Sequence, residues 1–262
     1  MKNFSRINVA IVGGSGLEDF LKATEQIRVG TPFGLPSPIT IGMVRKKPVA
    51  FLPRHGLRHN VPPHRVNYRA NLYGLHLLGV ERIFATNAVG AIAQNLKPGT
   101  LVVPHDFVDF TKSRQGTFYD DAPVTHVDMS QPYCPEMRSA LIKAAKTVGE
   151  SVCDEAVLAC TEGPRYETPA EVKLLRHFGC NIVGMTGLPE VVLARELEIC
   201  YASLSYVSNL AVGLQDHQTV DDIARTAEKC KPIVEQVLKE AIDSLSTTRN
   251  CVCVDALKDS QL

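Results

Sequence analysis

Residues 7–16 read INVAIVGGSG, an apolar run that passes directly into a glycine-rich turn. The run predicts a buried strand, and the glycines suit the tight turn that ends it. Such a turn exposes backbone N–H groups and the Ser15 hydroxyl, which together suit a bound phosphate. The stretch has neither the full Gly-x-Gly-x-x-Gly pattern nor the Gly-Lys-Ser/Thr of a P-loop, so by itself it does not separate an anion site from an ordinary turn.

Short apolar runs, turns and helical patterns alternate along the rest of the chain. This interleaving predicts a mixed α/β fold in a single domain over residues 1–262. We expect the tail from about residue 246 to be loosely ordered. The predicted strands are 7–12, 39–44, 49–52, 83–86, 101–103, 156–160, 181–184 and 200–207, and the predicted helices are 66–78, 135–148, 189–197, 219–245 and one that starts at Thr168.

Composition narrows the class of function. The chain has 262 residues, of which 45% are hydrophobic and 21% charged, as in a globular protein with a core. Its 28 basic and 28 acidic residues give no net charge, so a broad surface for nucleic acid or anionic lipid is absent and any anion needs a local site. No apolar run reaches the roughly 18–20 residues that cross a bilayer, and the first run is too short for a signal peptide. We therefore expect a cytoplasmic protein without membrane or nucleic-acid partners.

The eight cysteines are dispersed, and no two form a Cys-x-x-Cys pair. This spacing disfavours a zinc ribbon and favours buried free thiols. The chain also shows no Ser-His-Asp order, no His-Glu-x-x-His and no retained carboxylate pair. Neither covalent nor metal catalysis is indicated, and we expect no metal ligand.

Three segments at predicted strand ends could hold a phosphate. Arg54 and His55 follow an apolar run, where Arg offers a forked contact and His a further donor, although a solvated basic loop has the same pattern. Residues 86–91, which contain Asn87 and Ala88, predict either a second anion-binding turn or a bend where backbones pack closely. Thr186, between a strand and a helix start, is a third place where a hydroxyl could contact phosphate.

Four further residues could bind an organic ligand. Glu167 lies beside the Tyr166 ring and just before a helix cap, where it could accept from a ligand N–H or simply favour the helix N-terminus by a few tenths of a kcal/mol to roughly 1. Met185 could lie against an apolar sugar face. Asn209 ends a buried strand, and its amide could read N7 and O6 of a 6-oxopurine, or it could form an Asx turn.

Six short segments of the sequence, given at the end of this paragraph and called blocks, together resemble the trimeric purine nucleoside phosphorylase and methylthioadenosine phosphorylase family. They occur in the family's order between about residues 7 and 245. The resemblance implies one α/β domain with a mixed, partly barrel-like central sheet flanked by helices, assembled as trimers or dimers of trimers. It also implies phosphorolysis of a ribosyl–purine bond, with phosphate as co-substrate and no cofactor or metal. The blocks are GGSGL (13–17), PRHG (53–56), PHRVNYRAN (63–71), NAVG (87–90), EGPRYET (162–168) and MTGLPEV (185–191).

The resemblance also implies a role for each candidate residue. Met185 would lie under the ribose and Tyr166 beside the base, while His126 would come from a neighbouring subunit to cover the 5′ end. As the glycosidic bond loosens, Asn209 would donate to purine N7 while phosphate, bound by His55 among others, attacks C1′. The phosphate contacts of the family correspond to Ser15, Arg54, His55, Asn87, Ala88 and Thr186.

Substrate preference follows from four positions. Asn209 and Ala211 stand where methylthioadenosine enzymes carry two Asp residues, and Glu167 resembles the glutamate of 6-oxopurine enzymes. Val220 stands where inosine–guanosine enzymes place a His, and an apolar residue there suits a methylthio group. The combination favours S-methyl-5′-thioinosine. An inosine/guanosine phosphorylase, and then a methylthioadenosine phosphorylase, are the alternatives.

Other classes fit less well. An NAD-dependent oxidoreductase needs an acidic residue about 20 positions beyond the glycines, where this chain has Thr31-Pro32-Phe33-Gly34. A nucleoside-binding module without catalysis would not need every phosphate contact. Cys134 and Cys200 fall where some heat-stable relatives form a disulfide, and Cys251-Val252-Cys253 resembles their Cys-x-Cys tail, but the sequence leaves the redox state of these thiols open.

Overall fold

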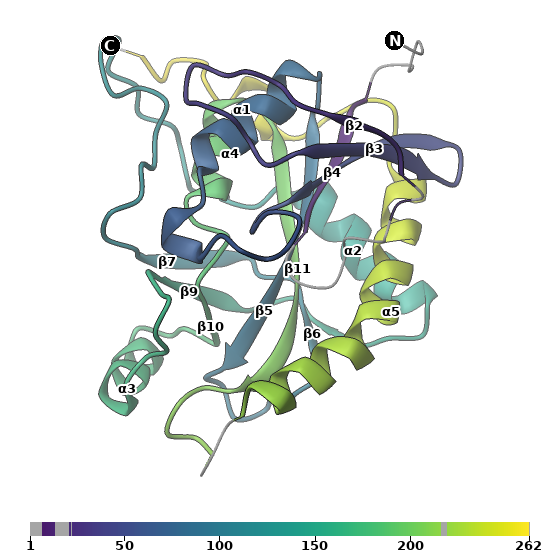
Figure 1. Cartoon of the computed structure of the whole chain (residues 1–262). Helices are drawn as coiled ribbons and strands as arrows, with labels where there is room; N and C mark the ends of the chain where they lie inside the picture. The colour runs from purple at the N-terminus through teal and green to yellow at the C-terminus, as the bar shows by residue number, and fades with distance from the viewer. Residues whose placement is uncertain (1–6, 14–20, 22, 216–218, 262) are drawn as a thin grey trace.

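The computed structural model describes residues 7–13, 21, 23–215 and 219–261, and the structural statements below concern these residues. Strands and helices alternate along the chain, and the helices lie on either side of a central sheet (Figure 1). The strands are β1 (Val9–Gly13), β2 (Ala23–Ile27), β3 (Ile39–Val44), β4 (Lys47–Pro53), β5 (Arg82–Ala91), β6 (Leu101–Val102), β7 (Asp106–Phe110), β8 (Val152–Cys153), β9 (Val157–Thr161), β10 (Ile182–Gly184) and β11 (Cys200–Leu210). The α-helices are α1 (Tyr68–Leu77), α2 (Pro135–Thr147), α3 (Pro169–His177), α4 (Glu190–Glu196) and α5 (Val220–Ser244), and two 3₁₀ turns are η1 (Pro63–Arg65) and η2 (Val252–Asp255).

One mixed sheet of 11 strands organises the chain, and it branches at β5. β5 pairs in parallel with β11 over its whole length and with β1 over its first half. Its last residues pair with β10 in antiparallel fashion. Along β5, β1 pairs only as far as Ala85 and β10 pairs only with Gly90 and Ala91. The carboxyl ends of β1, β4 and β10 therefore all point toward residues 86–89 of β5. The expected mixed α/β fold is confirmed.

Two apolar layers cover the sheet. α1 and α4 pack together on one side, whereas α2 and α5 pack together on the other and contact β11 (Figure 1). Nine of the 11 residues of β11 are buried, as expected for a strand covered on both faces. Local signals set the helix starts: Thr168 and Glu171 form a capping box at α3, and Thr219 and Asp222 form another at α5.

The predicted end of the strand at residue 86 is wrong. β5 continues to Ala91 because β11 and then β10 satisfy its backbone groups throughout. Small residues allow this close approach: a side chain on Gly90 would lie 3.2 Å from the Asn209 amide nitrogen. Ala88 therefore reaches the site from a strand, and residues 86–91 do not form an anion-binding turn.

The predicted loose order of the tail is also wrong. Cys251 and Cys253 are 7% and 2% exposed, so both pack into the core beneath α2 and α5. Polar contacts fix the tail as well, since Arg249 donates to the Glu198 carbonyl at 2.7 Å and Gln261 forms a bridge with Thr125. No helix among the described residues is both long and apolar enough to span a bilayer.

Candidate active site

A cavity of about 560 Å³ lies where β4, β5, β10 and β11 end. Its volume is in the range of small-molecule sites. The position agrees with the general rule that ligands of open α/β sheets bind beyond the strand ends. The structure brings ten of the predicted site residues to its lining: Arg54, His55, Asn87, Ala88, Tyr166, Glu167, Met185, Thr186, Asn209 and Ala211.

Arg54 is buried (1% exposed) and held on three sides. Its Nε and Nη2 donate to the two carboxylate oxygens of Glu190, at 2.5 and 2.9 Å, and its Nη1 donates to the Thr86 carbonyl at 2.9 Å. Burial opposes the charge, but the Glu190 carboxylate raises the pKa of Arg54 above its ordinary value. Tyr201 in turn donates its hydroxyl to Glu190 at 2.8 Å. Arg54 is therefore a permanent, rigidly oriented cation at the cavity wall.

Glu190 is a residue of this site that the sequence did not single out. It is fully buried at the first turn of α4. A carboxylate is almost never buried without a partner, so a glutamate inside the apolar pattern of residues 188–194 was the available signal.

Thr186 is oriented by a short chain of hydrogen bonds. Ser203 donates to the Asn87 amide oxygen at 2.6 Å, and the Asn87 amide nitrogen donates to the Thr186 hydroxyl oxygen at 2.5 Å. Because this oxygen accepts from Asn87, the Thr186 O–H can donate to a ligand in the cavity. Asn87 therefore serves to orient the Thr186 hydroxyl.

His55 is neutral in this setting. Its Nδ1 lies 2.8 Å from the Val61 carbonyl, which assigns the ring proton to Nδ1 and leaves Nε2 as an acceptor. Burial, followed by the neighbouring Arg54 charge, lowers the pKa of His55 to about 4. The expected donor role toward an anion therefore requires a second proton on the ring. A neutral His55 instead accepts a hydrogen bond, for example from a protonated phosphate oxygen.

This lowered pKa predicts acid sensitivity of the fold. Between the ordinary value of 6.5 and about 4, only the unfolded chain protonates His55, so stability falls as the pH falls through this window. At 1.36 kcal/mol per unit, the loss amounts to about 3 kcal/mol. We expect His55→Gln to abolish this part of the decline in denaturant melts at pH 7 and pH 4. His59→Gln should retain this decline. His59 is exposed, and its ring centroid lies 4.5 Å from that of His55. Equal pH slopes for His55→Gln and the unsubstituted chain would contradict the prediction.

Asn209 is aimed by an irregularity in β11. The register with β5 shifts between Val207 and Asn209, which re-orients the side chains at this point. Ser208 donates to the Asn209 amide oxygen at 2.5 Å, and the amide nitrogen donates to the Leu210 carbonyl at 2.8 Å. The Leu210 carbonyl can only accept, so this contact assigns the amide nitrogen, and the amide can present an N–H to a ligand in the cavity. Ser208 was not predicted as a site residue.

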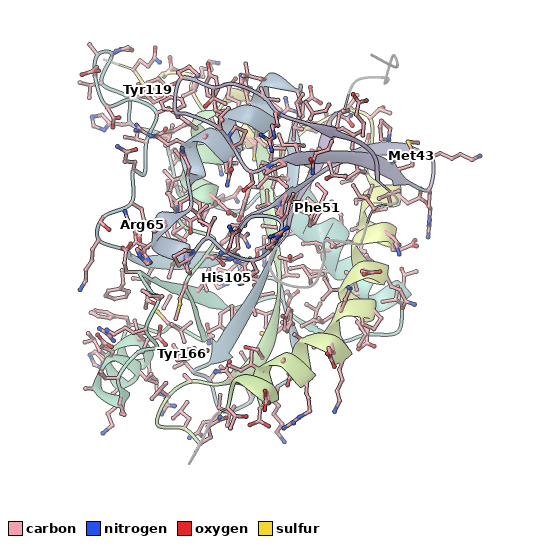
Figure 2. All side chains as sticks on the ribbon, in the orientation of Figure 1. Met43, Phe51, Arg65, His105, Tyr119 and Tyr166 are labelled. Carbon is pink, nitrogen blue, oxygen red and sulfur yellow. The ribbon has the colours of Figure 1, made fainter. Side chains whose placement is uncertain are left out.

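Three further predicted residues line the same cavity. Glu167 is 7% exposed and accepts from the Thr161 hydroxyl at 2.7 Å. Tyr166, which is 52% exposed, lies between α3 and the end of β5 at the cavity mouth (Figure 2). Met185 packs against Gly163, where a Cβ would lie 2.7 Å from its sulfur, so the glycine makes room for Met185.

Three predicted site residues are not placed in the cavity. Ser15 lies outside the described residues, and so does the side chain of Val220, the first residue of α5. Ile223, three positions further along α5, lines the cavity and was not predicted, although i, i+3 spacing from Val220 pointed to it. His126 is not among the described lining residues; it is exposed, and its backbone N–H donates to the Ser260 carbonyl at 2.8 Å. Its predicted action on a neighbouring subunit stays a prediction.

Comparisons with known proteins agree on one family. A family model described as the phosphorylase superfamily matches residues 8–243. A probable 6-oxopurine nucleoside phosphorylase of Dictyoglomus turgidum is 45% identical over 97% of both chains. A probable S-methyl-5′-thioinosine phosphorylase of Thermodesulfovibrio yellowstonii is 42% identical over 99% of both. Among solved structures, a methylthioadenosine phosphorylase from an Antarctic soil metagenomic library superposes with a TM-score of 0.93 at 35% identity, covering 98% of this chain and 93% of the other.

Proposed function

The chain belongs to the phosphorylase superfamily, and from this premise we propose that it cleaves 6-oxopurine nucleosides by phosphorolysis, with S-methyl-5′-thioinosine as the preferred substrate. The products are hypoxanthine and 5-methylthioribose 1-phosphate, as in purine and methylthioadenosine salvage. The enzyme is a pentosyltransferase of the purine nucleoside phosphorylase type. Inorganic phosphate is its co-substrate, and the proposed chemistry requires no organic cofactor or metal.

The observation that carries the proposal is the spacing of two polar groups along β5. Arg54 and Thr186 contact Thr86 and Asn87, whereas Asn209 lies against Gly90. At about 3.3 Å per residue, three to four residues separate the two groups by roughly 10–13 Å. This is the length over which a phosphate and a purine lie on opposite sides of one ribose.

In the proposed reaction, each of these residues contacts a different part of the two substrates. Phosphate would lie against Arg54 and accept from Thr186, and it attacks C1′ as the glycosidic bond loosens. Asn209 donates to purine N7 as negative charge builds on the leaving base, so this bond is strongest in the transition state. Glu167 accepts from N1–H of a 6-oxopurine. Positioning of the two substrates supplies most of the acceleration, since no covalent intermediate is needed.

Inosine or guanosine is the second candidate substrate class. It is favoured by the 45% identity to the Dictyoglomus protein named as a probable 6-oxopurine nucleoside phosphorylase. Methylthioadenosine is the third, favoured by the solved structure of a methylthioadenosine phosphorylase. We further propose a homotrimer or a dimer of trimers in the cytoplasm, in which His126 covers the 5′ end of a nucleoside bound by a neighbouring subunit.

One assay separates these functions. The purified protein is incubated with methylthioinosine, inosine, guanosine and methylthioadenosine, each with and without phosphate, and free base is measured. We expect base release only with phosphate, fastest from methylthioinosine. Turnover without phosphate, or no turnover of any of the four, would overturn the proposed function.

Val220→His tests the preference at the 5′ end. The substitution adds a hydrogen-bonding partner for a 5′-hydroxyl and a polar group against a methylthio group. One net hydrogen bond is worth about 1 kcal/mol, so we expect the kcat/KM ratio of inosine to methylthioinosine to rise about fivefold. Asp221→His, one position along the same helix, should leave the ratio unchanged. The same ratio in Val220→His as in the unsubstituted enzyme would remove Val220 from the pocket.

A further inference from the structure

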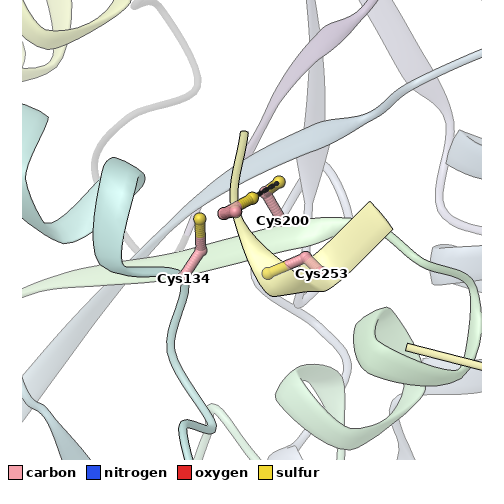
Figure 3. A group of neighbouring side chains, drawn as sticks. Cys134, Cys200 and Cys253 are labelled. Atoms are coloured by element: carbon pink, nitrogen blue, oxygen red, sulfur yellow. Dashed lines mark hydrogen bonds between the residues drawn. The ribbon is translucent and has the colours of Figure 1, made fainter. Parts of the chain in front are cut away.

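Four of the eight cysteines gather at one buried point far from the active site. All eight carry free thiols. The sulfur atoms of Cys134, Cys200, Cys251 and Cys253 all lie within 4.8 Å of one another, and all four residues are buried. Figure 3 shows them converging from three segments: the residue before α2, the first residue of β11, and the tail around η2.

The arrangement has the dimensions of a tetrahedral metal site. A zinc–thiolate bond of about 2.3 Å places the sulfurs of a tetrahedron about 3.8 Å apart. The Cys200 and Cys251 sulfurs are 3.3 Å apart, and no pair exceeds 4.8 Å, so the observed spacings bracket that value. Four ligands also complete the coordination that structural zinc requires, with no position left open.

The donor set selects the kind of metal. The group contains four sulfurs and no His, Asp or Glu. Thiolate ligands in tetrahedral array suit zinc or iron and do not suit the hard cations magnesium and calcium. Cys134 is the N-cap of α2, so the N-terminal end of this helix lies at the cluster.

From this geometry we propose that Cys134, Cys200, Cys251 and Cys253 bind one structural zinc ion as a closed Cys₄ site. The proposal revises the expectation that the chain holds no metal. The site escaped the sequence pattern because its ligands are a Cys-x-Cys pair and two distant cysteines, not two Cys-x-x-Cys pairs. It does not take part in catalysis: Cys200 and Asn209 are nine residues apart on β11, or about 30 Å. None of the four cysteines is among the described residues that line the cavity.

The ion would link the C-terminal tail to α2 and the central sheet. Cys251 and Cys253 belong to the tail, while Cys134 and Cys200 belong to α2 and the central sheet. Beyond the site, the tail continues to the bridge between Gln261 and Thr125 and to the Ser260 carbonyl that accepts from His126. Binding of the metal would therefore add to folding stability and hold the 125–126 segment in place.

Metal titration of the reduced protein tests the proposal without any activity assay. Protein that has been reduced and stripped with a chelator is titrated anaerobically with Co²⁺ and then with Zn²⁺. We expect thiolate-to-cobalt charge-transfer bands and tetrahedral ligand-field bands that saturate at one equivalent per chain and disappear when zinc replaces cobalt. Cys253→Ser should weaken zinc binding about 100-fold or more, since even changes behind the ligands cost 10–100-fold. Cys230→Ser, at a buried cysteine of α5, should bind zinc normally.

Two results would overturn the zinc site. The first is reduced, unsubstituted protein that shows no cobalt–thiolate bands or binds less than half an equivalent of zinc. The second is protein isolated without reductant that contains no metal and has fewer than eight titratable thiols after denaturation, which would indicate disulfides in place of zinc. Because both measurements use the unsubstituted chain, the test stands even if Cys253→Ser does not fold.

Discussion

Glu190→Gln is expected to destabilise the fold by about 3–5 kcal/mol, the usual cost of leaving one member of a buried ion pair without its partner. Arg54 and Glu190 are both about 1% exposed, and each carboxylate oxygen accepts from the guanidinium. The glutamine keeps the shape of the side chain but removes the charge that holds Arg54. For a chain of this size the loss corresponds to a fall in Tm of roughly 6–20 °C. Denaturant melts at fixed protein concentration measure it.

Two companion variants show whether the lost charge is the cause. Tyr201→Phe removes only the hydroxyl that donates to Glu190 and should cost about 1 kcal/mol. The double variant Arg54→Met/Glu190→Gln removes both charges and should regain most of the stability, because no buried charge is then unpaired. It should nevertheless have lost phosphate-dependent turnover, since Arg54 is the proposed phosphate ligand. A Glu190→Gln variant within 1 kcal/mol of the unsubstituted chain would show that this ion pair does not support the fold.

The ion pair refines what the zero net charge implies. The balance of 28 basic and 28 acidic residues excludes a broad anionic-ligand surface and leaves a local site. In that site the cation already has a carboxylate partner, so Arg54 contributes orientation and remaining N–H donors more than an excess of charge. The proposed phosphate would then also depend on neutral donors, and among the residues that the structure describes Thr186 is oriented for this role.

Local patterns predicted much of the fold and of the site. The capping box at Thr168, the strand into Gly13 and the polar residues at strand ends are short-range signals, and the ends of β4 and β10 meet beside β5 because these strands run toward each other. This is why ten predicted residues meet in one cavity. What escaped prediction depends on contacts between distant segments. The full length of β5 depends on β11, and the partner of Arg54 lies 136 residues away in α4.

The order of the C-terminal tail also depends on distant segments and could not be predicted from local patterns. Polar and small residues after position 246 resemble a disordered end, and nothing nearby in the sequence contradicts that interpretation. Order comes from Cys134 and Cys200, which lie at least 51 residues from Cys251 and complete the sulfur cluster around the tail. Sequence proximity could not reveal these partners.

The amide of Asn209 and the carboxylate of Glu167 together favour a 6-oxopurine over adenine. An asparagine with both ends available reads adenine well, because its oxygen accepts from the 6-amino group while its nitrogen donates to N7. Here the oxygen accepts from the Ser208 hydroxyl, and the Leu210 carbonyl fixes the nitrogen. The Asn209 N–H can donate to N7 of either kind of base, and Glu167, a hydrogen-bond acceptor, matches the N1–H that hypoxanthine and guanine carry and adenine lacks.

Asn209→Asp should consequently reverse the base preference. An ionised carboxylate at this position offers no donor to N7 or O6, so kcat/KM for methylthioinosine is expected to fall by about 10⁴, the magnitude for a lost, matched buried hydrogen bond. The protonated carboxyl group can donate to N7 while its other oxygen accepts from the 6-amino group, so kcat/KM for methylthioadenosine should rise. Parallel assays of both nucleosides at saturating phosphate give the ratio. Asn60→Asp makes the same amide-to-carboxylate change elsewhere in the cavity lining and should leave that ratio unchanged. An unaltered ratio in Asn209→Asp would show that Asn209 does not read the base, and discrimination would then fall to Glu167.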